Sequence, residues 1–164
     1  MILTPHAIIG ASLANIFPND PALGFGLAFF SHYVLDMLPH KDYDIDNFLE
    51  TETKTVKSIF HNAGAALHLL FISLDFIVAV FLCFLFFVRD EKSLLLTLVG
   101  IVGGLLPDFF QFLYYKYKNQ PWIFFQKIHD QNHNTNHMKE RPILGYLVQF
   151  TLVILFLVLF FWFN

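Results

Sequence analysis

The fold of this chain is decided by residues 64–88, which read GAALHLLFISLDFIVAVFLCFLFFV. This run is longer than the roughly 20 apolar residues that a helix needs to cross a bilayer. A second apolar run covers residues 142–163. A third, residues 93–112, has an adequate length, although Pro107 and Asp108 interrupt it near its end. The three segments predict an all-α integral membrane protein.

The composition of the whole chain agrees with this fold class. Of the 164 residues, 56% are hydrophobic and 22 are phenylalanine, and the mean hydropathy is +0.56. A soluble domain of this size could not bury so much apolar surface, whereas a bilayer solvates it. The net charge of −3 indicates no nucleic acid partner. The first residues, MILTPH, lack the positive region of a cleavable signal peptide, so we expect residue 1 to belong to the mature protein.

Two shorter apolar segments precede the long ones. They cover residues 5–17 and 21–37, and the turn signal PNDP separates them. With these two segments the sequence predicts a polytopic bundle of about five transmembrane helices, forming a single membrane domain over residues 1–164. The first segment is short for a full crossing, so a tilted, partly re-entrant or shielded helix remains open there.

Polar stretches lie between the apolar segments. Residues 41–57 are acidic and threonine-rich, which predicts a surface loop. In residues 119–141, Pro121 precedes aromatic residues and then three histidines. A proline in the first turn followed by this pattern favours an amphipathic interfacial helix over residues 121–137. The alternative is an aromatic-anchored loop without a role in metal binding.

Lysine and arginine residues are distributed unevenly between the two sides of the predicted bundle. With five crossings, residues 41–57 and 116–141 share a side with the N-terminus and contain most of the positive charges, while the other side carries only Arg89 and Lys92. The positive-inside rule then predicts a multi-pass protein of the inner (cytoplasmic) membrane with a cytoplasmic N-terminus and an interfacial helix on the cytoplasmic side.

Two sets of polar residues repeat at a spacing of four, which turns successive side chains only about 40° around a helix. The first set is His32, Asp36 and His40, and the second is His129, His133 and His137. In the predicted topology both sets lie on the cytoplasmic side of their segments. His6 and Asp108 lie on that side too. Residues far apart in the sequence are thus expected to reach one depth in the membrane.

Imidazole and carboxylate groups that converge in this way are typical ligands of a divalent metal ion. Zinc suits this donor set first, with manganese or iron as alternatives, and the number of groups is sufficient for one or two ions. We therefore predict a metal site formed by His6, His32, Asp36, His40, Asp108, His129, His133 and His137. The plainer interpretations are a hydrogen bond along one helix face for the first set and a solvated helix face for the second.

Other polar residues have weaker signals. His68 and Asp75 lie two turns apart in one apolar segment and are expected to be either a buried pair or partners that orient the ligands. Asp42 alternates with two further aspartates but lacks the glycine and the distal glutamate of a calcium loop. We interpret these three aspartates as a solvated acidic loop.

Short motifs in the chain resemble those of the YdjM-like family of inner-membrane metal-dependent hydrolases. They are the opening PHAIIG with His6, the later LLPD with Asp108, and the distal histidine cluster. The resemblance implies a small bundle of four or so transmembrane helices and a metal-dependent hydrolase activity. Carried over to this chain, it implies functional roles for His6, Asp108, His133 and His137.

The chain also departs from the family pattern. Phe110 and Gln111 stand where the central motif has a second aspartate and a histidine, and the distal histidines are four residues apart instead of five. Asp36 and His40 are candidates to supply what the central motif lacks.

These features together predict a membrane-embedded hydrolase that cleaves a lipid or lipid-linked phosphoester at the cytoplasmic leaflet, with Asp36, Asp108 and His133 as catalytic residues. Nucleophile-elbow, P-loop and dinucleotide-binding motifs are absent from the sequence. The alternatives are a metal-ion or proton-coupled transporter, in which histidines and carboxylates relay ions, and a scaffold that binds metal without catalysis. The sequence leaves the oligomeric state open.

Overall fold

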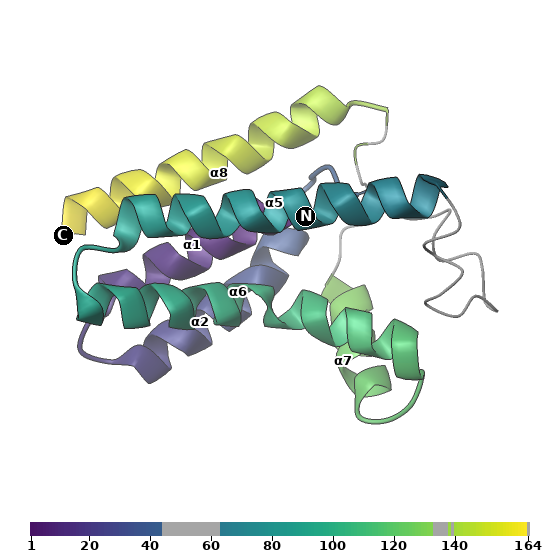
Figure 1. Cartoon of the computed structure of the whole chain (residues 1–164), viewed down its shortest axis with the longest axis horizontal. Coiled ribbons are helices and arrows are strands. Elements are labelled where there is room, and N and C mark those ends of the chain that lie inside the picture. Colours follow the sequence, from purple (N-terminus) through teal and green to yellow (C-terminus); the bar gives the residue numbers. More distant parts are fainter. Residues whose placement is uncertain (44–62, 133–137, 139, 164) are drawn as a thin grey trace.

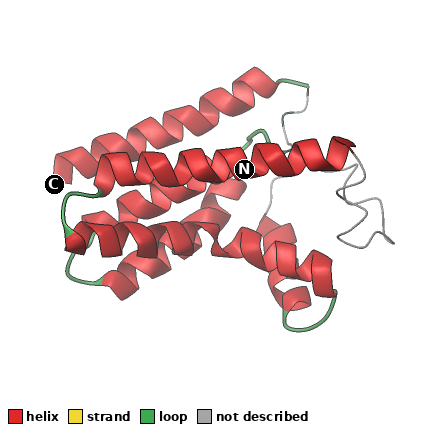
Figure 2. Ribbon diagram, viewed as in Figure 1, coloured by secondary structure: helices red, strands yellow, loops and turns green. Residues whose placement is uncertain are grey.

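The computed structural model describes residues 1–43, 63–132, 138 and 140–163, and this part of the chain contains helices and no strands (Figure 2). The helices are α1 (Leu3–Ile16), α2 (Pro21–Asp36), α5 (Ala63–Phe87), α6 (Glu91–Tyr117), α7 (Trp122–Asn132) and α8 (Pro142–Phe163). The predicted all-α class is confirmed, and each predicted helix has a counterpart in the structure.

Among the described residues, three helices are long and apolar enough to cross a membrane. They cover Ala66–Phe87, Glu91–Tyr117 and Pro142–Phe163. Large apolar side chains are exposed along them, including Phe81 and Trp162, as expected of surfaces that face lipid tails. α1 and α2 contain only 14 and 16 residues. At about 1.5 Å per residue they are shorter than the roughly 30 Å hydrocarbon core. The count of about five spans therefore stays a prediction.

The short helix α1 lies at the centre of the bundle and contacts α2, α5, α6 and α8 (Figure 1). Its residues 5–12 are all buried. Close packing on α6 depends on glycine, because a Cβ atom built on Gly10 would lie 2.4 Å from the carbonyl oxygen of Gly100. Two backbones that approach this closely leave no room for a side chain between them.

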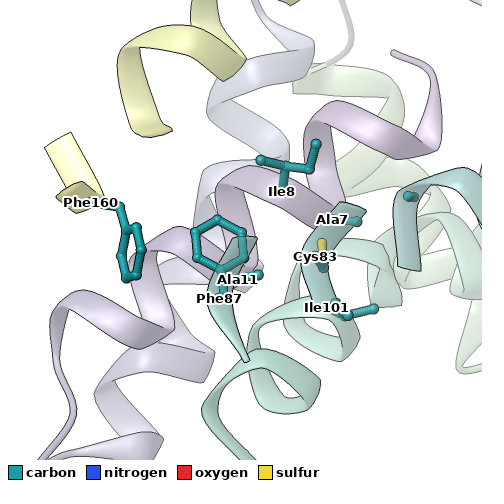
Figure 3. Close-up of a cluster of buried hydrophobic side chains, with 8 residues drawn as sticks. Ala7, Ile8, Ala11, Cys83, Phe87, Ile101 and Phe160 are labelled. Carbon is teal, nitrogen blue, oxygen red and sulfur yellow. The ribbon is translucent and has the colours of Figure 1, made fainter. Parts of the chain in front are cut away.

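An apolar cluster joins α1 to three longer helices. It contains Ala7, Ile8, Ala11, Ala79, Cys83, Phe87, Ile101 and Phe160 (Figure 3). The rings of Phe87 and Phe160 meet edge to face, with their centroids 4.7 Å apart. Nearby, Lys92 Nζ donates to Asn19 Oδ1 at 3.2 Å. The α1–α2 turn, the α5–α6 turn and the end of α8 therefore lie at one end of the bundle (Figure 1).

α6 begins at Glu91 and continues to Tyr117, beyond the predicted end at residue 112. Pro107 lies inside the helix, and the ribbon changes direction in its second half (Figure 1). A proline removes one backbone donor and bends a helix. Here it bends α6 without ending it.

α7 packs against the second half of α6 and also contacts α2. The ring of Phe110 lies 4.4 Å from that of Phe125 and 5.8 Å from that of Trp122. These aromatic contacts hold α7 over the end of the bundle opposite the α1–α2 turn (Figure 1). The predicted helix over residues 121–137 is found for Trp122–Asn132, and residues 133–137 lie outside the described part.

Candidate metal centre

Six of the predicted ligands come together where α1, α2, α6 and α7 meet. α1 contributes His6 from its first turns, and α2 contributes residues from its last two turns. Asp108 follows the proline bend of α6, and His129 lies on the buried face of α7. The six residues are His6, His32, Asp36, His40, Asp108 and His129. The other two predicted ligands, His133 and His137, lie outside the described residues.

The first group of ligand atoms surrounds Asp36, which is 1% exposed. Its Oδ1 lies 3.2 Å from His6 Nε2, and its Oδ2 lies 3.2 Å from His32 Nε2. The two imidazole rings are stacked with their centroids 4.0 Å apart. One ligand atom of each residue lies within 4.8 Å of the others, so the three side chains are close enough to share one ion.

The second group shares His32 with the first and adds Asp108 and His129. Asp108 Oδ1 lies 3.6 Å from His32 Nε2 and 3.8 Å from His129 Nε2. His129 Nε2 also lies 3.5 Å from Asp36 Oδ2. The four-residue spacing of His32 and Asp36 therefore brings both side chains to one helix face, as predicted, and α7 delivers a histidine to the same position.

Backbone carbonyl groups fix the orientation of two of these rings. His32 Nδ1 donates to Gly104 O at 2.8 Å, and His40 Nδ1 donates to Leu38 O at 2.6 Å. A carbonyl oxygen only accepts, so the proton of each neutral ring is on Nδ1 and the Nε2 lone pair points into the centre. This arrangement is typical of metal-binding histidines, whose second nitrogen is held by an acceptor.

The centre therefore has an excess of acceptor atoms. In the described part of the chain, His32 Nε2 and Asp108 Oδ2 are buried without a hydrogen-bond partner. His32 Nε2 faces two carboxylates, so this atom is satisfied either by a proton that it donates to them or by a cation that lies between them. A divalent ion with nitrogen and oxygen ligands satisfies these atoms, so the residues present fit zinc.

Asp42 is a member of this centre that sequence reasoning assigned to a solvated loop. That interpretation was wrong for Asp42, because its Oδ1 lies 3.0 Å from His40 Nε2 and also contacts the amino group of Met1. The other two aspartates lie outside the described residues. Burial alone would raise the pKa of Asp42, but the bond with His40 and the nearby ammonium group outweigh it and hold this pKa well below its usual range. The only signal in the sequence was its place two residues after His40.

Gln111 stands where the resembled family has a histidine. Its side-chain amide lies 3.5 Å from His129 Nδ1. This difference from the resembled pattern thus falls beside a candidate ligand, where the amide of Gln111 contacts the ring of His129.

Asp75 does not pair with His68, although this pairing was one of the two expectations. Its partners are in the first turn of α1 and at Tyr43.

The chain matches no protein-family model, no curated protein and no solved structure.

Proposed function

We propose that this chain is a membrane-embedded hydrolase that depends on a divalent metal ion, zinc first, and that acts on a lipid or lipid-linked phosphoester. The observation that carries the proposal is the convergence of His6, His32 and His129 on the carboxylates of Asp36 and Asp108, which forms two groups of close ligand atoms. Ionisable groups at membrane depth are costly and usually functional. One or two ions bound there would satisfy the acceptors.

A metal bound at such a site lowers the pKa of a coordinated water to about 7 and polarises a phosphoryl oxygen. His6, His32 and His129 are the neutral ligands in this proposal, and the carboxylates offset the charge of the ion. Asp108 is one-quarter exposed, whereas Asp36 is almost fully buried. We therefore assign Asp108 to the substrate side, as the group that accepts a proton, and Asp36 to the anchoring of the ion.

The surroundings support an anionic substrate that lies in the membrane. Lys116, Lys118 and Lys127 are exposed near this end of the bundle, and cations there would attract a phosphate group. Phe124 is exposed on α7, next to the aromatic residues that pack on α6. An apolar side chain there would enter the lipid while α7 covers the metal centre as a lid.

Purified protein in vesicles should release inorganic phosphate from a phosphomonoester, or a water-soluble phosphate ester from a phosphodiester, within a panel of phospholipids and polyprenyl phosphates, and a chelator should abolish the release. Zinc should restore it, because the ion supplies the nucleophilic water. The measurement is release of these products with and without chelator, alongside elemental analysis. Zinc uptake into the vesicles without product would favour the transporter, and bound zinc with neither uptake nor product would favour the scaffold.

We further propose an inner-membrane location with a cytoplasmic N-terminus. The charge asymmetry supports this orientation, and the bond between Lys92 and Asn19 supports the grouping of these two turns at one end. In a Cys83→Ala background, an impermeant maleimide should label Asn19→Cys in intact spheroplasts, and should label Lys118→Cys only after permeabilisation. The reverse pattern would contradict the orientation.

A further inference from the structure

Asp75 is a carboxylate near the middle of α5, within a candidate span that is otherwise almost entirely apolar. Such a group is costly at this depth and is normally paired or functional. It is not among the candidate ligands of the metal centre. The groups that hydrogen-bond to its carboxylate therefore indicate its role.

The carboxylate of Asp75 caps the beginning of α1. Its Oδ2 accepts from the backbone nitrogens of Leu3 at 2.8 Å and Thr4 at 3.2 Å, and its Oδ1 accepts from the Thr4 hydroxyl at 2.6 Å. α1 begins at Leu3, and the first N–H groups of a helix have no partner within it. Ile2 at the N-cap position has no polar side chain, so a residue of another helix performs the capping. His6 follows within one turn.

Tyr43 connects Asp75 to the segment that follows α2. Its hydroxyl donates to Asp75 Oδ2 and accepts from the backbone nitrogen of Leu3 at 3.1 Å. Burial and the bond to Asp75 raise the pKa of Tyr43 well above its usual value, so the phenol stays protonated and donates. Asp75 thus holds the segment that carries His6 and the segment that carries His40.

Gln149 in α8 makes an equivalent connection from the other side. It is 1% exposed. Its Oε1 accepts from the backbone nitrogen of Ile2 at 3.4 Å, and its Nε2 donates to the carbonyl oxygen of Lys41 at 2.8 Å. One turn earlier, a Cβ atom built on Gly145 would lie 2.7 Å from Lys41 N. α8 therefore lies directly against the segment beside His40.

We propose that Asp75 and Gln149 are positioning residues of the candidate metal centre. Each belongs to an outer apolar helix, and each hydrogen-bonds to both segments, residues 2–4 and residues 41–43. The first segment lies just before His6, and the second lies just after His40. The Nε2 atoms of these histidines lie 3.2 Å and 4.0 Å from Asp36 Oδ1. Loss of either link lets the two ligands move apart. This inference rests on the proposed function of the centre as a metal site.

The first test is zinc affinity of the full-length protein in detergent, measured by competition with a chelator. Asp75→Ala and Gln149→Leu should bind zinc about tenfold more weakly or worse, as is typical when groups that orient ligands are lost. Asp75→Asn should bind nearly as wild type, because its amide oxygen still accepts from the first turn of α1. Ser73→Ala and Thr151→Ala, at exposed positions of the same two helices, are the matched controls and should not change the affinity.

The second measurement needs no metal. The imidazole ¹⁵N signals of His6 and His40 in the metal-free protein should shift in Asp75→Ala and Gln149→Leu and stay unchanged in the controls. If Asp75→Ala does not fold, Tyr43→Phe is the second variant. It removes only the hydrogen bond from the Tyr43 hydroxyl to Asp75, with a smaller loss of stability, and should weaken zinc binding several-fold. Wild-type affinity in both main variants overturns the inference. If the wild type binds no zinc, the proposed function fails. The positioning role is tested separately, and it is overturned if the His6 and His40 signals are unchanged in Asp75→Ala and Gln149→Leu.

Discussion

An Asp36→Ala variant should lose bound zinc, to less than about a tenth of the wild-type content after dialysis. Within the described residues, the carboxylate of Asp36 reaches four histidine Nε2 atoms, those of His6 at 3.2 Å, His32 at 3.2 Å, His129 at 3.5 Å and His40 at 4.0 Å. Its removal leaves only Asp108 beside His32 and His129 and Asp42 beside His40, so the positive charge of an ion has less to offset it. Elemental analysis of purified protein measures the loss.

The control for this variant is Asp20→Ser in the same helix. Asp20 caps α2 by accepting from the backbone nitrogen of Leu23 at 2.9 Å, and serine is an equally good N-cap residue. This control should keep the full zinc content. Equal zinc in Asp36→Ala and wild type would show that the cluster is a structural hydrogen-bond network without an ion.

A Gly104→Ala variant should lose both stability and zinc affinity. A Cβ atom built on Gly104 would lie 2.4 Å from the carbonyl oxygen of His6. Because that oxygen belongs to the backbone, α1 and α6 must move apart, at a cost of about 1–3 kcal/mol. The same movement displaces His6 and the Gly104 carbonyl that orients His32. A lower melting temperature in detergent and a zinc affinity at least about tenfold weaker are expected.

Gly26→Ala is the matched control. A Cβ atom built on Gly26 would meet nothing within 4 Å, and alanine in a helix interior is favoured over glycine by roughly 0.5–1 kcal/mol. This variant should therefore melt at or above the wild-type temperature and bind zinc normally. Two glycine substitutions in the same bundle are thus expected to change stability in opposite directions. If Gly104→Ala also melts like wild type, the close packing of α1 on α6 does not hold His6.

The helices could be predicted from the sequence because the length of a long apolar run is close to the length of the helix that it forms. The predicted helix at residues 142–163 agrees with α8 at both ends. α6 extends beyond the predicted residues 93–112 at both ends, because a helix can continue past the apolar run from which it was predicted. The number of membrane crossings could not be settled in the same way, since α1 and α2 are apolar but short, and packing against other helices shields their polar groups.

The ligands could be predicted in part for a similar reason. The spacing of His32 and Asp36 is a local property of one helix, so it was readable in the sequence. The approach of His6 depends on Gly104 in another helix, and the contact of Asp42 depends on the path of the chain after α2. Asp75 and Gln149 were hardest to assign, because each acts on backbone groups far away in the sequence. The roles of His133 and His137, and the family resemblance, stay predictions.

The central place of α1 has a consequence for biosynthesis. α1 is synthesised before α8, yet Ser12 Oγ donates to the carbonyl oxygen of Phe156 in α8. At translation rates of about 5–20 residues per second, several seconds or more separate the synthesis of these two partners. Asn15 in α1 likewise lacks Thr97, its partner in α6, until α6 has been synthesised, so the polar side chains of α1 gain their partners one after another. Of the two groups of candidate ligands, the one that includes His129 is complete only after α7 has been synthesised, whereas His6, His32 and Asp36 all precede it in the chain.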